Sequence, residues 1–101
     1  MNIKNPRVLL DTHSVRSGPA YQSSEALLKF VAKLGVGTSA SVMVEMSADG
    51  VNNWLEVGTF TLDTAGEEVD TDLLRVPLPY VRARVLSIAG NTPRITIYMG
   101  S

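Results

Sequence analysis

Apolar and polar residues alternate with a period of two along the middle of the chain. Between residues 38 and 62, a first run places Ala40, Val42, Val44 and Met46 at even positions, and a second runs from Trp54 to Leu62. This alternation is typical of a half-buried β-strand. Asp49-Gly50 lies between the two runs, and an Asp-Gly pair in that setting is a strong hairpin signal. We therefore predict a central β-hairpin over residues 38–62.

The second arm of this hairpin changes its periodicity part of the way along. Leu55 and Val57 are odd-numbered, whereas Phe60 and Leu62 are even-numbered. One inserted residue would return all four side chains to the core face, and glycine is common where a strand bulges. The pattern predicts a β-bulge at Gly58-Thr59.

Residues 25–34 fit two periods. As a strand, Leu28, Phe30, Ala32 and Leu34 share one face; as a helix, an apolar stripe follows Ser24 as a candidate N-cap. A ten-residue helix is marginal alone and the following chain has strand periodicity, so we favour the strand. Gly35-Val36-Gly37 then predicts a hairpin connection to the next strand.

The two ends of the chain also carry strand patterns. A first strand is expected near residues 7–12, and a second hairpin is expected from residues 80–88 and 95–99 around the turn at 90–93. Pro77 and Pro79 cannot donate ladder hydrogen bonds, so residues 76–79 should form an edge, a crossing connection or an extended arm. Together these patterns give about seven to eight strands. They predict an all-β fold, either an antiparallel, jelly-roll-like β-sandwich or a small barrel.

Length and charge limit the possible partners. The chain has 101 residues, the size of one domain, so we predict a single β-sandwich domain over residues 1–101 with residues 1–24 as a partly extended arm. Nine basic and ten acidic residues give a net charge of −1, which offers no general attraction to nucleic acid or to an anionic membrane. The N-terminus lacks the apolar region of a signal peptide, so we expect a soluble product made in the cytoplasm.

Candidate chemistry is sparse. There is no cysteine and one histidine, and the spacing of Asp11, His13 and Ser14 does not suit a catalytic triad. Acidic residues crowd residues 56–72, but they lack the spacing of a calcium loop. We therefore expect no enzymatic activity, no cofactor and no metal site. Arginines Arg75, Arg82, Arg84 and Arg94 follow the acidic stretch and are expected to pair with it or to face an acidic partner.

One combination of motifs resembles a known family. The string S-A-D-G-V-N-N-W-L-E-V-G-T-F (47–60), then P-Y-V-R-A-R-V (79–85) and T-P-R-I-T-I-Y (92–98), resembles small β-sandwich virion proteins of tailed bacteriophages. It is similar in layout to the capsid cement, or decoration, proteins. The likeness covers roughly residues 38–99, and the S-x-D-G-x-x-W spacing has one extra asparagine here.

The resemblance implies a non-enzymatic virion structural protein on the capsid surface. It would bind the major capsid protein and sister copies of itself as a homo-oligomer, without nucleic acid or membrane, after synthesis in the host cytoplasm. The candidate interface residues are Trp54, Pro77, Pro79, Tyr80, Arg82 and Arg84. The alternative is a carbohydrate-binding or tail-associated β-sandwich module in which Trp54 or Tyr80 stacks on a glycan, although a lone tryptophan is more often partly buried in the core.

Overall fold

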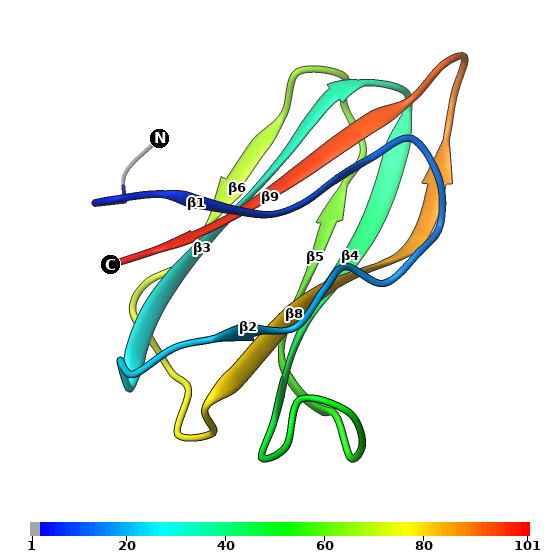
Figure 1. Cartoon of the computed structure of the whole chain (residues 1–101). Coiled ribbons are helices and arrows are strands. Elements are labelled where there is room, and N and C mark those ends of the chain that lie inside the picture. Colours follow the sequence, from blue (N-terminus) through cyan, green and yellow to red (C-terminus); the bar gives the residue numbers. More distant parts are fainter. Residues whose placement is uncertain (1–2) are drawn as a thin grey trace.

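Residues 3–101, the part of the chain that the computed structural model describes, form nine β-strands and no helix (Figure 1). The strands are β1 (Arg7–Thr12), β2 (Tyr21–Gln22), β3 (Leu27–Val36), β4 (Ser39–Ser47), β5 (Leu55–Leu62), β6 (Glu68–Asp70), β7 (Leu74–Arg75), β8 (Tyr80–Ala89) and β9 (Arg94–Gly100). All strand pairs are antiparallel. The predicted all-β antiparallel sandwich is confirmed. No helix within these residues is long and apolar enough to cross a bilayer.

The strands form two sheets. The first sheet has the order β1-β9-β3-β6, with β7 also paired to β3, and the second has the order β2-β8-β4-β5. The chain follows the path of one long antiparallel ribbon, folded back on itself. Along this ribbon the paired strands are, in order, β1 with β9, β2 with β8, β3 with β6 and β7, and β4 with β5. This ribbon wraps into two layers, and its tip is the loop of residues 48–54 between β4 and β5 (Figure 1).

The core lies between the two layers. It is lined by alternate residues of the long strands, as period-two patterning requires. The first sheet contributes Leu9, Leu10, Phe30, Leu34, Ile95 and Ile97, and the second contributes Val42, Val44, Phe60, Leu62, Val81 and Val85. All are 5% exposed or less. The two sheets are therefore held together by the apolar side chains packed between them.

The local strand predictions are largely confirmed. The first strand spans residues 7–12 as expected, and the ambiguous segment at 25–34 is a strand, β3. In β4, Ala40, Val42 and Val44 are buried, in agreement with the predicted even-numbered core face. The hairpin of β4 and β5 is also present, but seven residues, not a two-residue Asp-Gly turn, connect its strands.

The bulge in the second arm exists one residue earlier than predicted. Val44 pairs with Gly58 and Glu45 pairs with Glu56, so Val57 is the extra residue and the bulge lies at Val57-Gly58. Leu55 lies opposite Met46 and Phe60 opposite Val42, which places both on the core face. Leu55 is nevertheless 53% exposed, because it sits at the end of an edge strand.

Two predicted hairpins are wrong. The predicted connection at residues 35–37 does not join paired strands, because β3 and β4 belong to different sheets. The turn at 90–93 likewise joins β8 to β9 across the layers. Turn residues mark a chain reversal but do not say whether the chain stays in its sheet. The two crossings touch: a Cβ on Gly90 would lie 2.7 Å from the Gly37 Cα, and both glycines have positive φ (122° and 126°).

The N-terminal segment, predicted as a partly extended arm over residues 1–24, contributes strands to both layers where it is described. β1 pairs with β9 in the first sheet, and β2 pairs with β8 in the second. Between them, Gly18 donates to the Ala83 carbonyl (2.7 Å) and the Arg16 carbonyl accepts from Val85 (2.8 Å). Residues 1–2 of that prediction lie outside the described residues.

Candidate functional site

The register of β4 against β8 brings several predicted interface residues to one end of the second sheet. Glu45 lies opposite Arg82 and Ser47 lies opposite Tyr80. Their neighbours Val44, Val81 and Ala83 belong to the core, so these four side chains lie on the outer face of the sheet. Together with the loop 48–54, which contains Trp54, they form what we call the tip cluster.

A buried ion pair anchors the tip cluster. The Arg82 Nε donates to Glu45 Oε1 at 3.0 Å, and the side chains are only 22% and 7% exposed. The Arg82 guanidinium carbon also lies 4.1 Å from the centre of the Trp54 ring, a cation–π geometry. Trp54 is half-buried as a result, and its indole N–H donates to the Val51 carbonyl at 3.3 Å. One face of the tryptophan ring is therefore occupied from within the subunit.

Ser47 organises the loop from its first residue. Its buried hydroxyl oxygen accepts from the backbone N–H groups of Asp49 (3.3 Å) and Gly50 (3.1 Å). The hydroxyl donates to either the Asn52 carbonyl oxygen (2.7 Å) or the Asp49 carboxylate (3.0 Å). The Ser47 side chain thus bonds to both sides of the loop, and these bonds explain why the loop turns tightly around Ser47.

Asp49 closes the loop from the other side. Its Oδ1 accepts from the backbone N–H groups of Val51 and Asn52, each at 2.9 Å. These bonds to the charged carboxylate, from Asn52 first and then Val51 and Ser47, lower the pKa of Asp49 below its usual value. The Ser-x-Asp-Gly motif therefore builds a rigid loop, in which Asp49 Oδ1 is already bonded to backbone N–H groups.

Tyr80 packs directly against the loop at Gly50. This glycine has a φ of 76°, and a Cβ at this position would lie 2.9 Å from Tyr80 Cδ1. Only glycine satisfies both the left-handed backbone and the contact with the ring. Tyr80 therefore contacts the loop at Gly50, and Trp54, at the end of the loop, contacts Arg82. Both aromatic rings thus have a partly structural role.

The remaining predicted interface residues lie outside the tip cluster. Arg84 is exposed on β8, opposite Met43. Pro77 is exposed and Pro79 is half-buried in the connection between β7 and β8, where the Pro79 carbonyl accepts from the Ser23 N–H at 2.8 Å. Residues 76–79 are therefore a connection alongside β2 and β3, one of the three options predicted for them.

Two of the four C-terminal arginines pair with acids outside the acidic stretch. Arg82 pairs with Glu45, and Arg94 makes a two-point contact with Asp11 through Nε (2.9 Å) and Nη2 (2.6 Å). The Arg94 hydrogen bond lowers the pKa of Asp11, and that pair is largely solvent-exposed. The expected pairing with residues 56–72 does not hold for these two, because strand register decides the neighbours.

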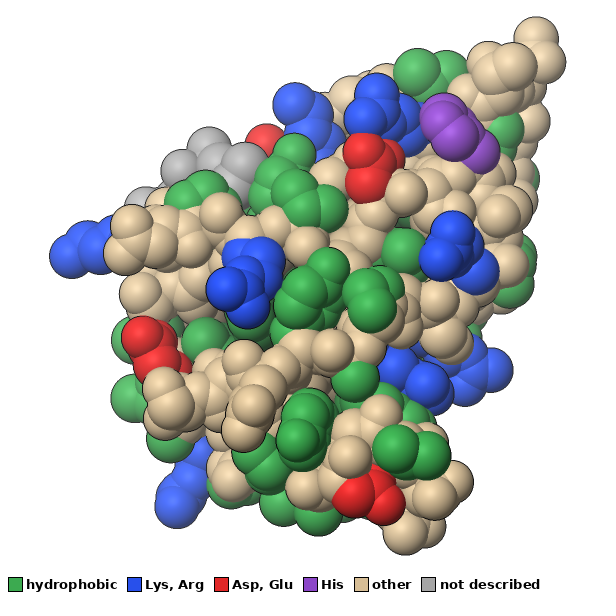
Figure 2. All heavy atoms as spheres, viewed as in Figure 1, with side chains coloured by type: hydrophobic (Ala, Val, Ile, Leu, Met, Phe, Trp, Pro, Cys, Tyr) green, Lys and Arg blue, Asp and Glu red, His purple; other side chains and the backbone are tan. Residues whose placement is uncertain are grey.

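Two exposed apolar side chains lie at the tip cluster, one in its loop and one just after it. The sequence pattern predicted no role for Val51 and a core-facing position for Leu55. Val51, in the loop, is 71% exposed, the largest exposed fraction of any large apolar side chain within residues 3–101. Leu55, at the start of β5, is 53% exposed. Val51 is exposed because it lies in the seven-residue loop, and Leu55 because it begins the edge strand β5. On the face shown in Figure 2, lysine and arginine side chains are spread among apolar ones and form no single block of charge.

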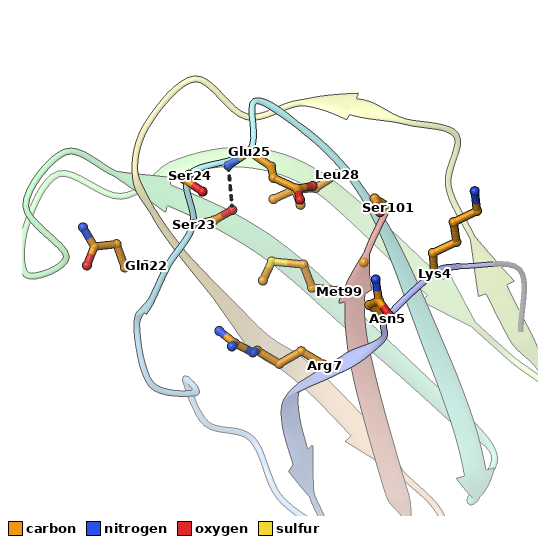
Figure 3. Close-up of a pocket in the computed structure, with 11 residues that line it drawn as sticks. Lys4, Asn5, Arg7, Gln22, Ser23, Ser24, Glu25, Leu28, Met99 and Ser101 are labelled. Carbon is orange, nitrogen blue, oxygen red and sulfur yellow. Dashed lines mark hydrogen bonds between the residues drawn. The ribbon is translucent and has the colours of Figure 1, made fainter.

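A pocket of about 250 Å³ opens beside Met99 and the C-terminal Ser101 (Figure 3). Buried Leu28 and Met99 line it, together with polar side chains from β1 and the residues before it, from the end of β2 and the β2–β3 connection, and from the C-terminal residue: Lys4, Asn5, Arg7, Gln22, Ser23, Ser24, Glu25 and Ser101. Among its lining side chains there is no histidine, and Glu25 is the one acidic group. Its residues are distant in sequence, and the β1–β9 and β3–β9 pairings bring them together. Within residues 3–101, no three His, Asp or Glu side chains cluster as metal ligands.

Comparison with known proteins identifies the fold. No protein-family model matches the chain, and no curated protein matches it. A solved structure described as the PBSX exported protein XepA matches with a TM-score of 0.66 and 17% sequence identity, over 95% of this chain and 37% of XepA. The chain therefore spans little more than a third of XepA. At this identity the likeness establishes a shared sandwich architecture.

Proposed function

We propose that this chain is a non-enzymatic structural protein of a phage particle that binds the capsid shell through the tip cluster and the apolar residues around it. Its partners are then the major capsid protein and sister copies, and its location is the capsid surface after synthesis in the host cytoplasm. The observation that carries the proposal is a rigid, aromatic-lined loop with exposed Val51 and Leu55 beside it. Exposed apolar groups on a pre-organised loop favour protein binding, because little conformational entropy is lost on docking.

The fold adds support from two sides. XepA, which shares this architecture over the 37% of its chain that matches, is described as a PBSX exported protein. The wrapped-ribbon strand order also fits the expected jelly-roll connectivity when β6 and β7 are counted as one interrupted strand, and jelly rolls are common in viral shells. Trp54, Tyr80 and Arg82 are the residue types that dominate binding energy at protein interfaces.

The test is co-sedimentation of purified protein with DNA-free shells of its phage. We expect wild-type protein to pellet with the shells and Val51→Asp to lose most of that binding, since it places a charge in the contact. Val15→Asp is the matched control, because Val15 is also exposed (59%) and lies in a loop. Absence of wild-type binding, or equal loss in both variants, would contradict the proposal.

The alternative is a glycan-binding or tail-associated module, which rests on the half-buried Trp54 and Tyr80 side chains. Aromatic faces stack on sugar rings, but Arg82 already covers one face of Trp54. A glycan array with wild-type protein and a folded Trp54→Leu variant decides this alternative. Signals lost only in the variant support it, whereas an array without signals rejects it.

A further inference from the structure

β5 is the least protected sheet edge in the described chain. It is the outer strand of the second sheet, and over eight residues it contains no proline, lysine or arginine. The other edges are short or charged: β2 and β7 have two residues each, β6 has three, and β1 carries Arg7 and Asp11. The one charged residue of β5 is Glu56, near its start. Long edges with so little charge are usually avoided in monomeric proteins, because their free backbone groups pair with another strand.

The pairable part of β5 has defined ends. Pairing with β4 is regular from Gly58 to Leu62 and is interrupted before it by the bulge at Val57. After Leu62, the Asp63 backbone N–H is already bonded to the Glu67 carboxylate at 2.9 Å. Residues 58–62, here called the edge segment, have the sequence G-T-F-T-L, which is uncharged and rich in β-forming residues. No backbone hydrogen bond joins them to a strand other than β4 within residues 3–101.

We propose that the edge segment pairs antiparallel with the edge segment of a second copy of this chain, about a twofold axis at Phe60. In this register Gly58 lies opposite Leu62, and Thr59 lies opposite Thr61. The core-facing side chains of both copies then share one face, and the threonines share the other, as a continuous sheet requires.

Charge supports a second copy as the occupant. The acids that flank the edge segment are Glu56 and Asp63. In the register centred on Phe60, Glu56 lies opposite Thr64 and Asp63 lies opposite Val57, so no two acids face each other. Glu56 is also held along its own strand by the Thr59 hydroxyl, which donates to its carboxylate at 3.0 Å. The segment is therefore compatible with itself.

The contact is small, so we expect a weak, concentration-dependent dimer in solution. Five paired residues per strand span about 17 Å at roughly 3.3 Å per residue. On a particle surface, where copies are held close together, such a contact gains strength from the raised effective concentration. The pairing extends beyond capsid binding, since a chain can dimerise whether or not it binds shells.

Cysteine cross-linking tests the register directly, because the chain has no cysteine of its own. Thr59→Cys protein is mixed with Thr61→Cys protein and treated with a short thiol cross-linker. We expect a severalfold higher yield of covalent heterodimer than from the control mixture of Thr61→Cys with Ser87→Cys. The control cysteine at position 87 would lie on the central strand β8, and it is also exposed. Directly opposite residues have Cβ atoms about 5 Å apart, within reach of the reagent.

A second measurement does not depend on the cross-linker. Sedimentation velocity of wild-type protein over a concentration series should show a rising weight-average mass, and Thr59→Lys/Thr61→Lys should remain monomeric because like charges would then face each other. Ser87→Lys is the control that should dimerise. A monomeric wild type with no cross-link overturns the proposal, and a dimer in which the Thr59/Thr61 pair does not exceed its control overturns the edge register. Neither result bears on shell co-sedimentation, so the two proposals fail separately.

Discussion

At the scale of residues, the buried pair of Glu45 and Arg82 decides how the tip cluster holds together. A carboxylate that is 7% exposed depends on its partner for compensation, since desolvated charges are costly without one. From the sequence, Arg82 was predicted only to be a candidate interface residue or a partner of the acidic stretch. What it actually touches follows from the β4–β8 register, which places it opposite Glu45 and under Trp54.

Replacing one partner of this pair should cost more than replacing both. We expect Arg82→Met to lower the free energy of unfolding by about 2–4 kcal/mol, because it leaves the Glu45 charge buried alone. The double variant Glu45→Met/Arg82→Met should recover most of that loss. Urea unfolding of the wild type, Arg82→Met, Glu45→Met and the double variant measures the coupling, and additive losses would contradict it.

Gly50→Ala should destabilise the protein more than Gly66→Ala. Both glycines have positive φ (76° and 83°), but a Cβ meets the Tyr80 ring only at Gly50, and nothing lies within 4 Å at Gly66. The backbone strain of about 1 kcal/mol is common to both variants. The difference between their unfolding free energies therefore isolates the contact with Tyr80, and equal values would show that the ring moves away without cost.

The loop should also respond to acid through Asp49. Because its backbone hydrogen bonds hold the folded-state pKa of Asp49 below the usual value of 3.8, the charged form stabilises the folded protein above that pH. This contribution is lost as pH falls through the folded-state pKa. We expect Asp49→Asn to have a flatter dependence of unfolding midpoint on pH below about 4 than the wild type. Parallel curves would contradict the role of the carboxylate.

At the scale of elements, the bulge at Val57 aligns the two arms of the central hairpin. Sequence periodicity predicted it because Leu55 and Phe60 have different parity, and a one-residue error in its position arose because glycine lies beside the inserted residue. The same reasoning could not detect that β3–β4 and β8–β9 cross between sheets. Their turns contain the usual glycine and proline, and the partner strands are remote in sequence.

Deleting single residues from β5 should separate the bulge from the regular strand. Deleting Val57 removes the inserted residue and leaves Phe60 opposite Val42, so we expect a folded protein with a modest loss of stability. Deleting Thr61 instead shifts the buried Leu62 to the outer face, at a cost of about 2–5 kcal/mol for one aliphatic side chain. Circular dichroism and thermal unfolding compare the two, and equal tolerance would contradict the observed register.

At the scale of the whole molecule, the two sheets share one core and should unfold together. Ile97 lies in the first sheet, and Trp54 reports on the tip of the second. We expect Ile97→Ala to lower stability by about 2–4 kcal/mol and to shift the tryptophan fluorescence transition and the far-ultraviolet circular dichroism transition equally. Separate transitions would show that the layers unfold independently.

The sequence by itself determined the all-β class, most strand positions, the central hairpin and the presence of a bulge, because alternation and turn chemistry are local properties. The strand assignment of residues 25–34 also followed from its context. Only the tertiary structure decided which strands pair, which turns cross between layers, and which side chains Trp54, Tyr80 and Arg82 contact. Those features depend on pairings between residues far apart in the chain, such as Glu45 with Arg82 and Arg7 with Met99, and no local pattern encodes them.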